Sequence, residues 1–295
     1  MHFLITGGTG FIGTALIESL QKKGHAATVL TRQGLPDRSD CRYVSDLDDI
    51  DSGKQFDGVI NLAGASLAGA RWTDGYKREL VASRVDTTRA LVQLFDRLDH
   101  TPPVLLSGSA IGYYGHHGDE LLAEDGEVVP GFAQRLCEQW EAAALQAEAL
   151  GVRVCLLRLG VVLDSGGGAL SDMARPFNLG IANWLGEGHQ WLSWVHRRDV
   201  VAAIGYLLEQ PVLSGPFNIT APEPVTSRGF CDAMKRHKRT FLTMPVPAPA
   251  MRLMVGEMAD ELLLNGQRVL PSALAAAGFE FGFPTLDEAL ADIYG

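Results

Sequence analysis

The stretch ITGGTGFIGTAL, residues 5–16, decides how the first part of this chain folds. Its glycines Gly7, Gly10 and Gly13 have the spacing G-x-x-G-x-x-G and come directly after the apolar run HFLIT (2–6). Four apolar residues then recur at the spacing of one helical face, namely Ile12, Leu16, Ile17 and Leu20. A second apolar run, AATVLT (26–31), follows. A strand, a glycine turn, a helix and another strand within about 30 residues form the context of a dinucleotide-binding fingerprint.

Each glycine of this motif has its own physical role. Gly7 allows the tight turn, Gly10 lets the backbone approach a pyrophosphate, and Gly13 lets the helix pack closely on the sheet. The pyrophosphate would lie at the amino terminus of the helix, where free N–H groups and the helix dipole attract an anion. The motif therefore predicts a nucleotide site rather than a glycine-rich turn without a ligand.

The end of the second strand indicates which dinucleotide binds. An acidic residue there hydrogen-bonds the ribose 2′-hydroxyl of NAD, whereas an arginine accommodates the 2′-phosphate of NADP. The sequence at this point is TVLTRQG, 28–34, so Thr31 and Arg32 take the position and no acid does. A guanidinium can bind a phosphate through two parallel, charge-assisted hydrogen bonds. We therefore predict NADP as the cofactor.

Apolar runs alternate with amphipathic stretches through the rest of the first half. Further strands are predicted at GVINLAG (58–64), PVLLSGSA (103–110) and VRVCLLRLG (152–160), with helices at 79–98 and 135–150 between them. Such alternation is typical of right-handed βαβ units. It predicts an α/β fold of the Rossmann type, with a doubly wound parallel sheet and a smaller carboxy-terminal part on the substrate side.

We expect two parts in the chain. Residues 1–165 are predicted to form an NADP-binding Rossmann domain, to which residues 195–222 return. Residues 166–295 are predicted to form the smaller carboxy-terminal part that caps the cleft. After the proline-rich connector MPVPAPAMR (244–252), the last segment, 245–295, is expected to be a distinct small helical module.

Composition narrows the class of partner. The formal net charge of −10 argues against nucleic acid, because a protein that binds a phosphate backbone needs a surplus of Lys and Arg. No apolar run reaches the roughly 18 residues of a membrane span, and no leader pattern begins the chain, so we expect no membrane partner. The four cysteines are far apart, which favours reduced thiols and a cytoplasmic location. The expected partner is a small-molecule substrate.

Several motifs together carry a resemblance to a known family. TGGTGFIG (6–13), NLAG (61–64) and SGSAIGYYG (107–115) occur in the order seen in extended short-chain dehydrogenases/reductases. More narrowly, the chain resembles an epimerase-like (nucleoside-diphosphate-sugar epimerase-like) family of unestablished activity. The stretches that carry this narrower resemblance are RWTDGYKRELVASRVDTT (71–88), RLGVVLDSGGGAL (158–170) and the long carboxy-terminal stretch 256–290. The resemblance covers essentially the whole chain.

This resemblance implies further cofactor contacts. Phe11 and Ile12 would line the pyrophosphate together with the glycines, and Leu62 and Ala63 would lie near the adenosine half. The other positions that match NADP contacts of the family are Glu79, Arg84 and Val162.

The sequence departs from the superfamily in its catalytic residues. The usual machinery is Tyr-x-x-x-Lys on a helix, with a serine from the preceding strand. Ser109 takes the place of that serine, with Ser107 as the alternative, but Phe132 and Leu136 hold the approximate places of the tyrosine and the lysine. No tyrosine of the chain is followed four residues later by lysine, and a phenyl ring cannot transfer a proton.

Two phenols lie close to Ser109 in the sequence. Tyr113 is our candidate for proton transfer, and its neighbour Tyr114 is the alternative; both could equally be packing residues. No metal is expected, because His116, His117 and Glu120 are not joined by further ligands at a familiar spacing.

These features lead to one functional hypothesis and one alternative. The first is an NADP-dependent oxidoreductase or epimerase-like enzyme that acts on a small polar substrate such as a sugar nucleotide. The second is a non-catalytic NADP-binding sensor or interaction protein, which the missing Tyr/Lys pair favours.

Overall fold

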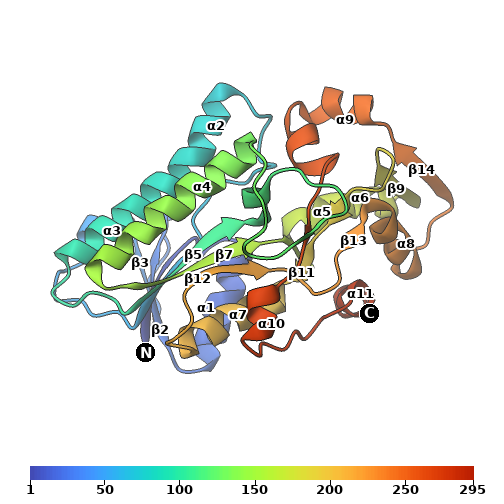
Figure 1. Ribbon diagram of the computed structural model, residues 1–295. Helices are drawn as coiled ribbons and strands as arrows, with labels where there is room; N and C mark the ends of the chain where they lie inside the picture. The colour runs from blue at the N-terminus through green and yellow to red at the C-terminus, as the bar shows by residue number, and fades with distance from the viewer.

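A seven-stranded sheet forms the centre of the computed structural model, which describes residues 1–295 (Figure 1). Its strand order is β12-β7-β5-β4-β1-β2-β3, and every neighbouring pair is parallel. The strands are β1 (His2–Thr6), β2 (Ala26–Leu30), β3 (Cys41–Val44), β4 (Gly58–Asn61), β5 (Val104–Ala110), β7 (Arg153–Leu159) and β12 (Gly215–Ile219). The predicted parallel α/β sheet is confirmed.

Helices cover both faces of this sheet, which makes it doubly wound. Helices α1 (Phe11–Lys22) and α7 (Arg197–Glu209) pack on one face, in a core that includes Val29 and Leu157. Helices α3 (Thr87–Arg97) and α4 (Phe132–Leu145) pack on the other, in a core that contains Leu105. In Figure 1, α1 and α7 lie below the sheet, and α3 and α4 lie above it.

The order of the strands reverses between β1 and β4. From β1 the chain continues outward to β2 and β3 on one side, and then returns to β4 on the other. In sheets of this kind, ligands bind in the crevice at the carboxyl ends of the strands at such a switch point. The fold therefore directs attention to the segments that follow β1, β2 and β4.

The predicted helix 79–98 is divided. Helix α2 (Asp74–Val81) is followed by a π-helical turn, Ala82–Asp86, before α3 begins at Thr87. π-helical turns inside α-helices occur frequently at functional sites. The buried residues Leu80 and Val85 are five positions apart across this turn, instead of the three or four of a regular helical face.

The second part of the molecule is built from short strands and helices, most of which lie at the right of Figure 1. Its strand pairs are β8 (Val161–Leu163) with β11 (Trp194–His196), β9 (Ile181–Leu185) with β14 (Leu242–Val246), β10 (Trp191–Leu192) with β13 (Val225–Thr226), and β6 (Leu121–Leu122) with β15 (Arg268–Val269). Its helices are α5 (Gly168–Met173), α6 (Arg175–Asn178), α8 (Ser227–His237), α9 (Ala248–Val255), α10 (Ser272–Ala276) and α11 (Leu286–Tyr294).

Residues 245–295, predicted to be a distinct small helical module, pack against more than one core of the molecule. Met258 packs with residues of α2 and α4, Leu274 of α10 joins the core below the central sheet, and Leu290 of α11 joins a third core. The segment therefore stabilises three different regions. Its apolar residues were visible in the sequence, but their partners lie in distant segments.

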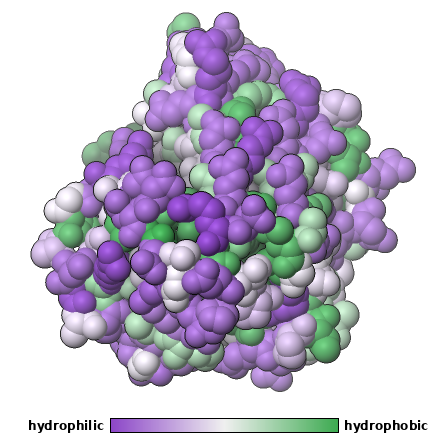
Figure 2. All heavy atoms as spheres, turned by 90° about the vertical axis from the view of Figure 1, so that its left-hand side faces the viewer, coloured by the Kyte–Doolittle hydropathy of each residue, from purple (hydrophilic) through white to green (hydrophobic).

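The outer surface of the central domain is largely hydrophilic. Figure 2 views the molecule from the left of Figure 1 and shows apolar residues only as small groups between polar ones. No helix combines the length and the apolar character that crossing a bilayer would require.

Candidate functional site

Two of the three glycines in the turn after β1 are required because the chain packs closely against them. Gly7 has φ +68°, and a Cβ there would lie 2.3 Å from the carbonyl oxygen of Leu62. A Cβ on Gly13 would lie 2.2 Å from the carbonyl oxygen of Gly7. Around Gly10, by contrast, only that same Gly7 oxygen is within 4 Å of an added Cβ, at 3.1 Å. Gly10 therefore leaves room beside the backbone, as a bound pyrophosphate would need.

The amino terminus of α1 offers free hydrogen-bond donors. Gly10 is the N-cap, and no side chain caps the helix. The backbone N–H groups of Phe11, Ile12 and Gly13 have no acceptor in the chain. Uncapped N–H groups and the positive end of the helix dipole make such a terminus a binding site for an anion.

A glycine-rich loop packs beside this helix terminus. Arg197, the first residue of α7, donates a hydrogen bond to the carbonyl oxygen of Phe11 (3.2 Å) and pairs with Asp164 (2.7 Å). A Cβ on Gly167 or Gly168 would lie within 3 Å of the Phe11 ring. The contact of Arg197 and Asp164 at this terminus escaped the sequence analysis, because the two residues are 33 positions apart.

The two residues predicted to select NADP lie directly after β2. Thr31 is buried, and its hydroxyl accepts a hydrogen bond from the N–H of Gln33 (3.2 Å). The side chain of Arg32 is exposed and makes no hydrogen bond or ion pair in the chain. Its guanidinium is therefore free for a phosphate.

The end of β4 lies against the end of β1 at the switch point. The N–H of Leu62 donates to the carbonyl oxygen of Thr6 (3.1 Å), and the N–H of Ala63 donates to the Thr6 hydroxyl (3.2 Å). Val162 of β8 is half-buried and packs against the core below the sheet. The tertiary structure therefore brings Leu62 and Ala63 to the glycine turn.

Arg84 is a half-buried cation without an acidic partner. It lies in the π-helical turn, and its guanidinium donates to the carbonyl oxygens of Leu80 (3.2 Å) and Ala65 (3.0 Å). Burial lowers the pKa of this guanidinium below its ordinary value. Glu79 is exposed and forms no ion pair with Arg84. A half-buried charge without an acidic partner favours the binding of an anionic ligand beside it.

Ser109, the predicted catalytic serine, is buried in a polar network. Its hydroxyl donates to the carboxylate of Glu141 (2.6 Å), which is paired with Arg158 through two contacts of 2.9 Å. Burial alone would lower the pKa of Arg158, but the hydrogen bonds and the charge of Glu141 raise it above its ordinary value. Ser107 is also buried and binds Asn61 (3.1 Å). Ser109 would have to release Glu141 before it could donate to a substrate.

The structure distinguishes the two phenols that the sequence left open. The hydroxyl of Tyr114 is buried, donates to Asn218 (2.7 Å) and accepts from Arg158 (3.0 Å). Burial raises the pKa of Tyr114. Tyr113 is half-buried, its hydroxyl makes no hydrogen bond in the chain, and its ring lies 3.5 Å from the Arg158 guanidinium carbon. Of the two phenols, Tyr113 is the available one.

Phe132 and Leu136, at the places of the missing pair, belong to an apolar cluster. The buried members of this cluster are Trp72, Leu80, Leu136 and Met258, and Phe132 packs against them. The rings of Trp72 and Phe132 meet edge to face at 5.1 Å. Cys137 follows on the same helix, and burial raises its pKa to about 12, which keeps the thiol neutral. The places of the tyrosine and the lysine therefore carry no proton-transfer group.

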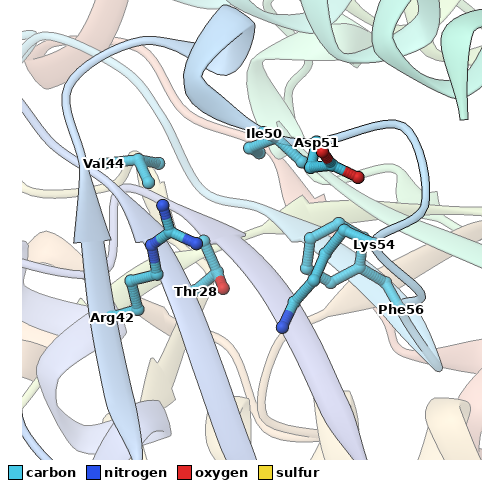
Figure 3. A pocket seen from close by; sticks show the side chains of 7 residues that line it. All are labelled: Thr28, Arg42, Val44, Ile50, Asp51, Lys54 and Phe56. Carbon is cyan, nitrogen blue, oxygen red and sulfur yellow. The ribbon is translucent and has the colours of Figure 1, made fainter.

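A cavity elsewhere on the molecule contains none of the predicted site residues. It lies beside β2 and β3, and Figure 3 shows the guanidinium of Arg42 and the ammonium of Lys54 on either side of Thr28. Its lining residues are Thr28, Arg42, Val44, Ile50, Asp51, Lys54 and Phe56. The candidate site is therefore the switch point, where the glycine turn meets Leu62 and Ala63.

Comparison with known proteins agrees with this geometry. A family model described as the NAD-dependent epimerase/dehydratase family matches residues 3–220. The chain belongs to this family. A second model, described as a domain of unknown function (DUF1731), matches residues 246–293.

Relatives of the family match the chain over its whole length. It is 39% identical over 299 residues to an epimerase family protein of Staphylococcus aureus, and the match covers 99% of this chain and 98% of the relative. The human epimerase family protein SDR39U1, whose crystal structure contains NADPH, is 30% identical in sequence to this chain. Its structure matches with a TM-score of 0.90 over 100% of this chain and 99% of the human one. The nucleoside-diphosphate sugar epimerase of Corynebacterium glutamicum is 29% identical with a TM-score of 0.81, and this chain spans 58% of its length.

Proposed function

We propose that this protein binds NADP(H) at the amino terminus of α1 and catalyses an oxidoreductase or epimerase-like reaction on a small polar substrate. The observation that carries the proposal is the uncapped terminus at Phe11–Gly13, next to a glycine that leaves room for a ligand. The structural relative with NADPH, at 30% identity over the whole chain, supports the same cofactor.

The preference for NADP rests on charge at two places. Arg32 has no partner in the chain and lies after β2, where a 2′-phosphate would be bound. Arg84 is half-buried, has no acidic partner and would attract a second anionic group of the ligand. The uncapped N–H groups of α1 would bind the pyrophosphate between them.

Within the cleft, the residues of the chain would hold and orient a substrate. The bound cofactor supplies a hydride donor or acceptor. Tyr113 has a free hydroxyl that can form a hydrogen bond to a substrate oxygen, and Arg158 holds its ring in place. Ser109 stays a predicted catalytic residue. The relative described as a nucleoside-diphosphate sugar epimerase, at 29% identity, supports a sugar nucleotide as the substrate class.

The cofactor assignment is tested by replacing Arg32. We expect the wild type to bind NADPH more tightly than NADH, and Arg32→Ala to weaken NADPH binding by about 10- to 100-fold, because a charge-assisted contact of about 1.5–3 kcal/mol is lost. NADH binding should change little. Fluorescence titration of both cofactors measures these affinities.

Arg42→Ala is the matched control, because Arg42 is also exposed and unpaired but lies on β3 in the cavity of Figure 3. It removes the same charge and should leave both affinities unchanged. Equal binding of NADPH and NADH by the wild type, or an unaltered preference in Arg32→Ala, would contradict the assignment.

One observation favours the alternative function, a non-catalytic NADP(H)-binding sensor. Both candidate serines are buried, and Phe132 and Leu136 are part of an apolar cluster. Transfer of deuteride from labelled NADPH to a panel of carbonyl compounds and sugar nucleotides separates the two functions. Tight NADPH binding without transfer to any member of a broad panel would favour the sensor.

A further inference from the structure

A lysine from another helix lies close to Phe132, which takes the place of the missing tyrosine. The ammonium of Lys77, on α2, lies 4.8 Å from the centre of the Phe132 ring. It forms an ion pair with Glu257 at 2.5 Å. The side chains of Lys77 and Glu257 are 22% and 46% exposed, so solvent or a ligand can reach the pair.

A second carboxylate from the same carboxy-terminal segment binds the start of α4. Glu261 accepts hydrogen bonds from the N–H groups of Phe132 (3.2 Å) and Ala133 (3.1 Å). No side chain of α4 itself caps this terminus. A carboxylate at a helix amino terminus is favourable, so Glu261 fixes the carboxy-terminal segment against α4. Both glutamates lie in the region that matches the domain of unknown function.

These contacts bring a lysine to the first turn of α4, although α4 contains none. Lys77 is the sole lysine between Lys54 and Lys235 in the sequence. An ammonium group can donate a hydrogen bond and a proton to a substrate oxygen, and lysine serves as a general acid or base in enzymes. The aromatic ring of Phe132 supplies a surface that attracts this cation.

We propose that Lys77 is the proton-transfer residue of this site, and that Glu257 and Glu261 of the carboxy-terminal segment position it. The proposal rests on the proposed NADP(H)-dependent function. A substrate carbonyl carbon would accept a hydride from NADPH while its oxygen accepts a proton from Lys77. The products are the alcohol, NADP⁺ and a neutral amine, which regains its proton from water. Oxidation of an alcohol follows the same steps in reverse.

Chemical labelling tests this assignment without turnover. The chain has six lysines: Lys22, Lys23, Lys54, Lys77, Lys235 and Lys238. We expect reductive methylation to modify Lys77 in the free protein, as detected by mass spectrometry of peptides. The rate of methylation at Lys77 should fall severalfold when NADPH is bound. Lys54, in the cavity of Figure 3, is the internal control and should react at the same rate with and without NADPH.

Variants test the chemical role in the same assay of deuteride transfer. Lys77→Met should lower the rate by about 10²–10⁴-fold while NADPH affinity stays near that of the wild type. Lys77→Arg should not restore the rate, because a guanidinium does not release its proton. Glu257→Gln should cause a smaller loss. Lys23→Met, which breaks the exposed pair with Glu209, is the matched control and should leave the rate unchanged.

The outcomes separate this proposal from the cofactor assignment. Bound NADPH that leaves the labelling of Lys77 unaltered overturns the role of Lys77 while the cofactor assignment stands. A wild-type rate of deuteride transfer in Lys77→Met also overturns the role of Lys77 and leaves the cofactor assignment standing. The ion pair of Lys77 with Glu257 would then be only a structural link between α2 and the carboxy-terminal segment. Absence of NADPH binding overturns both.

Discussion

At the scale of single residues, two glycines of the turn are required by the fold, and the third leaves room for a ligand. Gly7 and Gly13 are fixed by the close approach of the chain to itself, at Leu62 and at the turn. Gly10 is not crowded by the chain in this way. The motif alone could not assign these different causes, because all three glycines look the same in the sequence.

Gly13→Ala should therefore destabilise the protein. The added Cβ would lie 2.2 Å from the carbonyl oxygen of Gly7, so the turn or the helix must shift. We expect a loss of about 1–3 kcal/mol in the free energy of unfolding, together with weaker NADPH binding. Urea denaturation at equilibrium measures the loss. Gly34→Ala is the control, because nothing lies within 4 Å of a Cβ there; an equal loss in both variants would contradict the explanation.

At the scale of secondary-structure elements, one buried ion pair joins α4 to the central sheet. Glu141 of α4 and Arg158 of β7 are both nearly inaccessible to solvent. The same pair contacts Ser109 through Glu141 and Tyr113 through Arg158. It therefore links the sheet and the helix to the hydroxyl of Ser109 and to the ring of Tyr113.

Glu141→Gln should cost far more stability than the loss of an exposed pair. The variant leaves the Arg158 guanidinium buried without its carboxylate, which costs about 3–5 kcal/mol. Asp48→Asn, which breaks the exposed pair with Arg97, should cost about 0–1 kcal/mol. Chemical denaturation of both variants gives the comparison. A loss in Glu141→Gln no larger than in Asp48→Asn would show that the buried pair does not stabilise this interface.

The elements also show where periodicity is informative. Apart from β3, which no predicted strand covers, the strands of the central sheet and the helices beside them follow from alternating apolar patterns, and the structure confirms them. The apolar pattern of residues 79–98 predicts one regular helix and therefore misses the π-helical turn that holds Arg84. The same holds for the start of α4, whose cap, Glu261, is 129 residues away from Phe132.

At the scale of the whole molecule, His196 connects the two parts of the chain. It is the N-cap of α7, accepts a hydrogen bond from the N–H of Arg198 (3.1 Å) and stacks on Phe283 at 3.9 Å. Its Nε2 atom lies 3.5 Å from the carboxylate of Asp292 on α11. Burial lowers the pKa of His196 below the ordinary value of 6.5, although the nearby carboxylates Asp164, Asp292 and Asp199 oppose this shift.

This environment predicts that stability falls on the acid side of neutrality. Because the folded pKa is lowered, the contribution of neutral His196 is fully present above pH 6.5 and is lost as the pH falls through that value toward the folded pKa. His196→Asn keeps a cap acceptor but does not titrate, so its unfolding free energy should depend less steeply on pH between 7.5 and 5.5. His100→Asn, at an exposed position, is the control. Equal slopes in the wild type and His196→Asn would contradict the prediction.

The sequence by itself determined the glycine turn, the parallel α/β sheet and the family. These depend on local backbone conformation and on the repeat of apolar residues, which neighbouring positions encode. The preference for NADP rests on Arg32 and stays a prediction. The tertiary structure decided which phenol is free and brought Lys77 and Glu257, 180 residues apart, together beside Phe132. That juxtaposition depends on how distant segments pack, and no local pattern in the sequence specifies it.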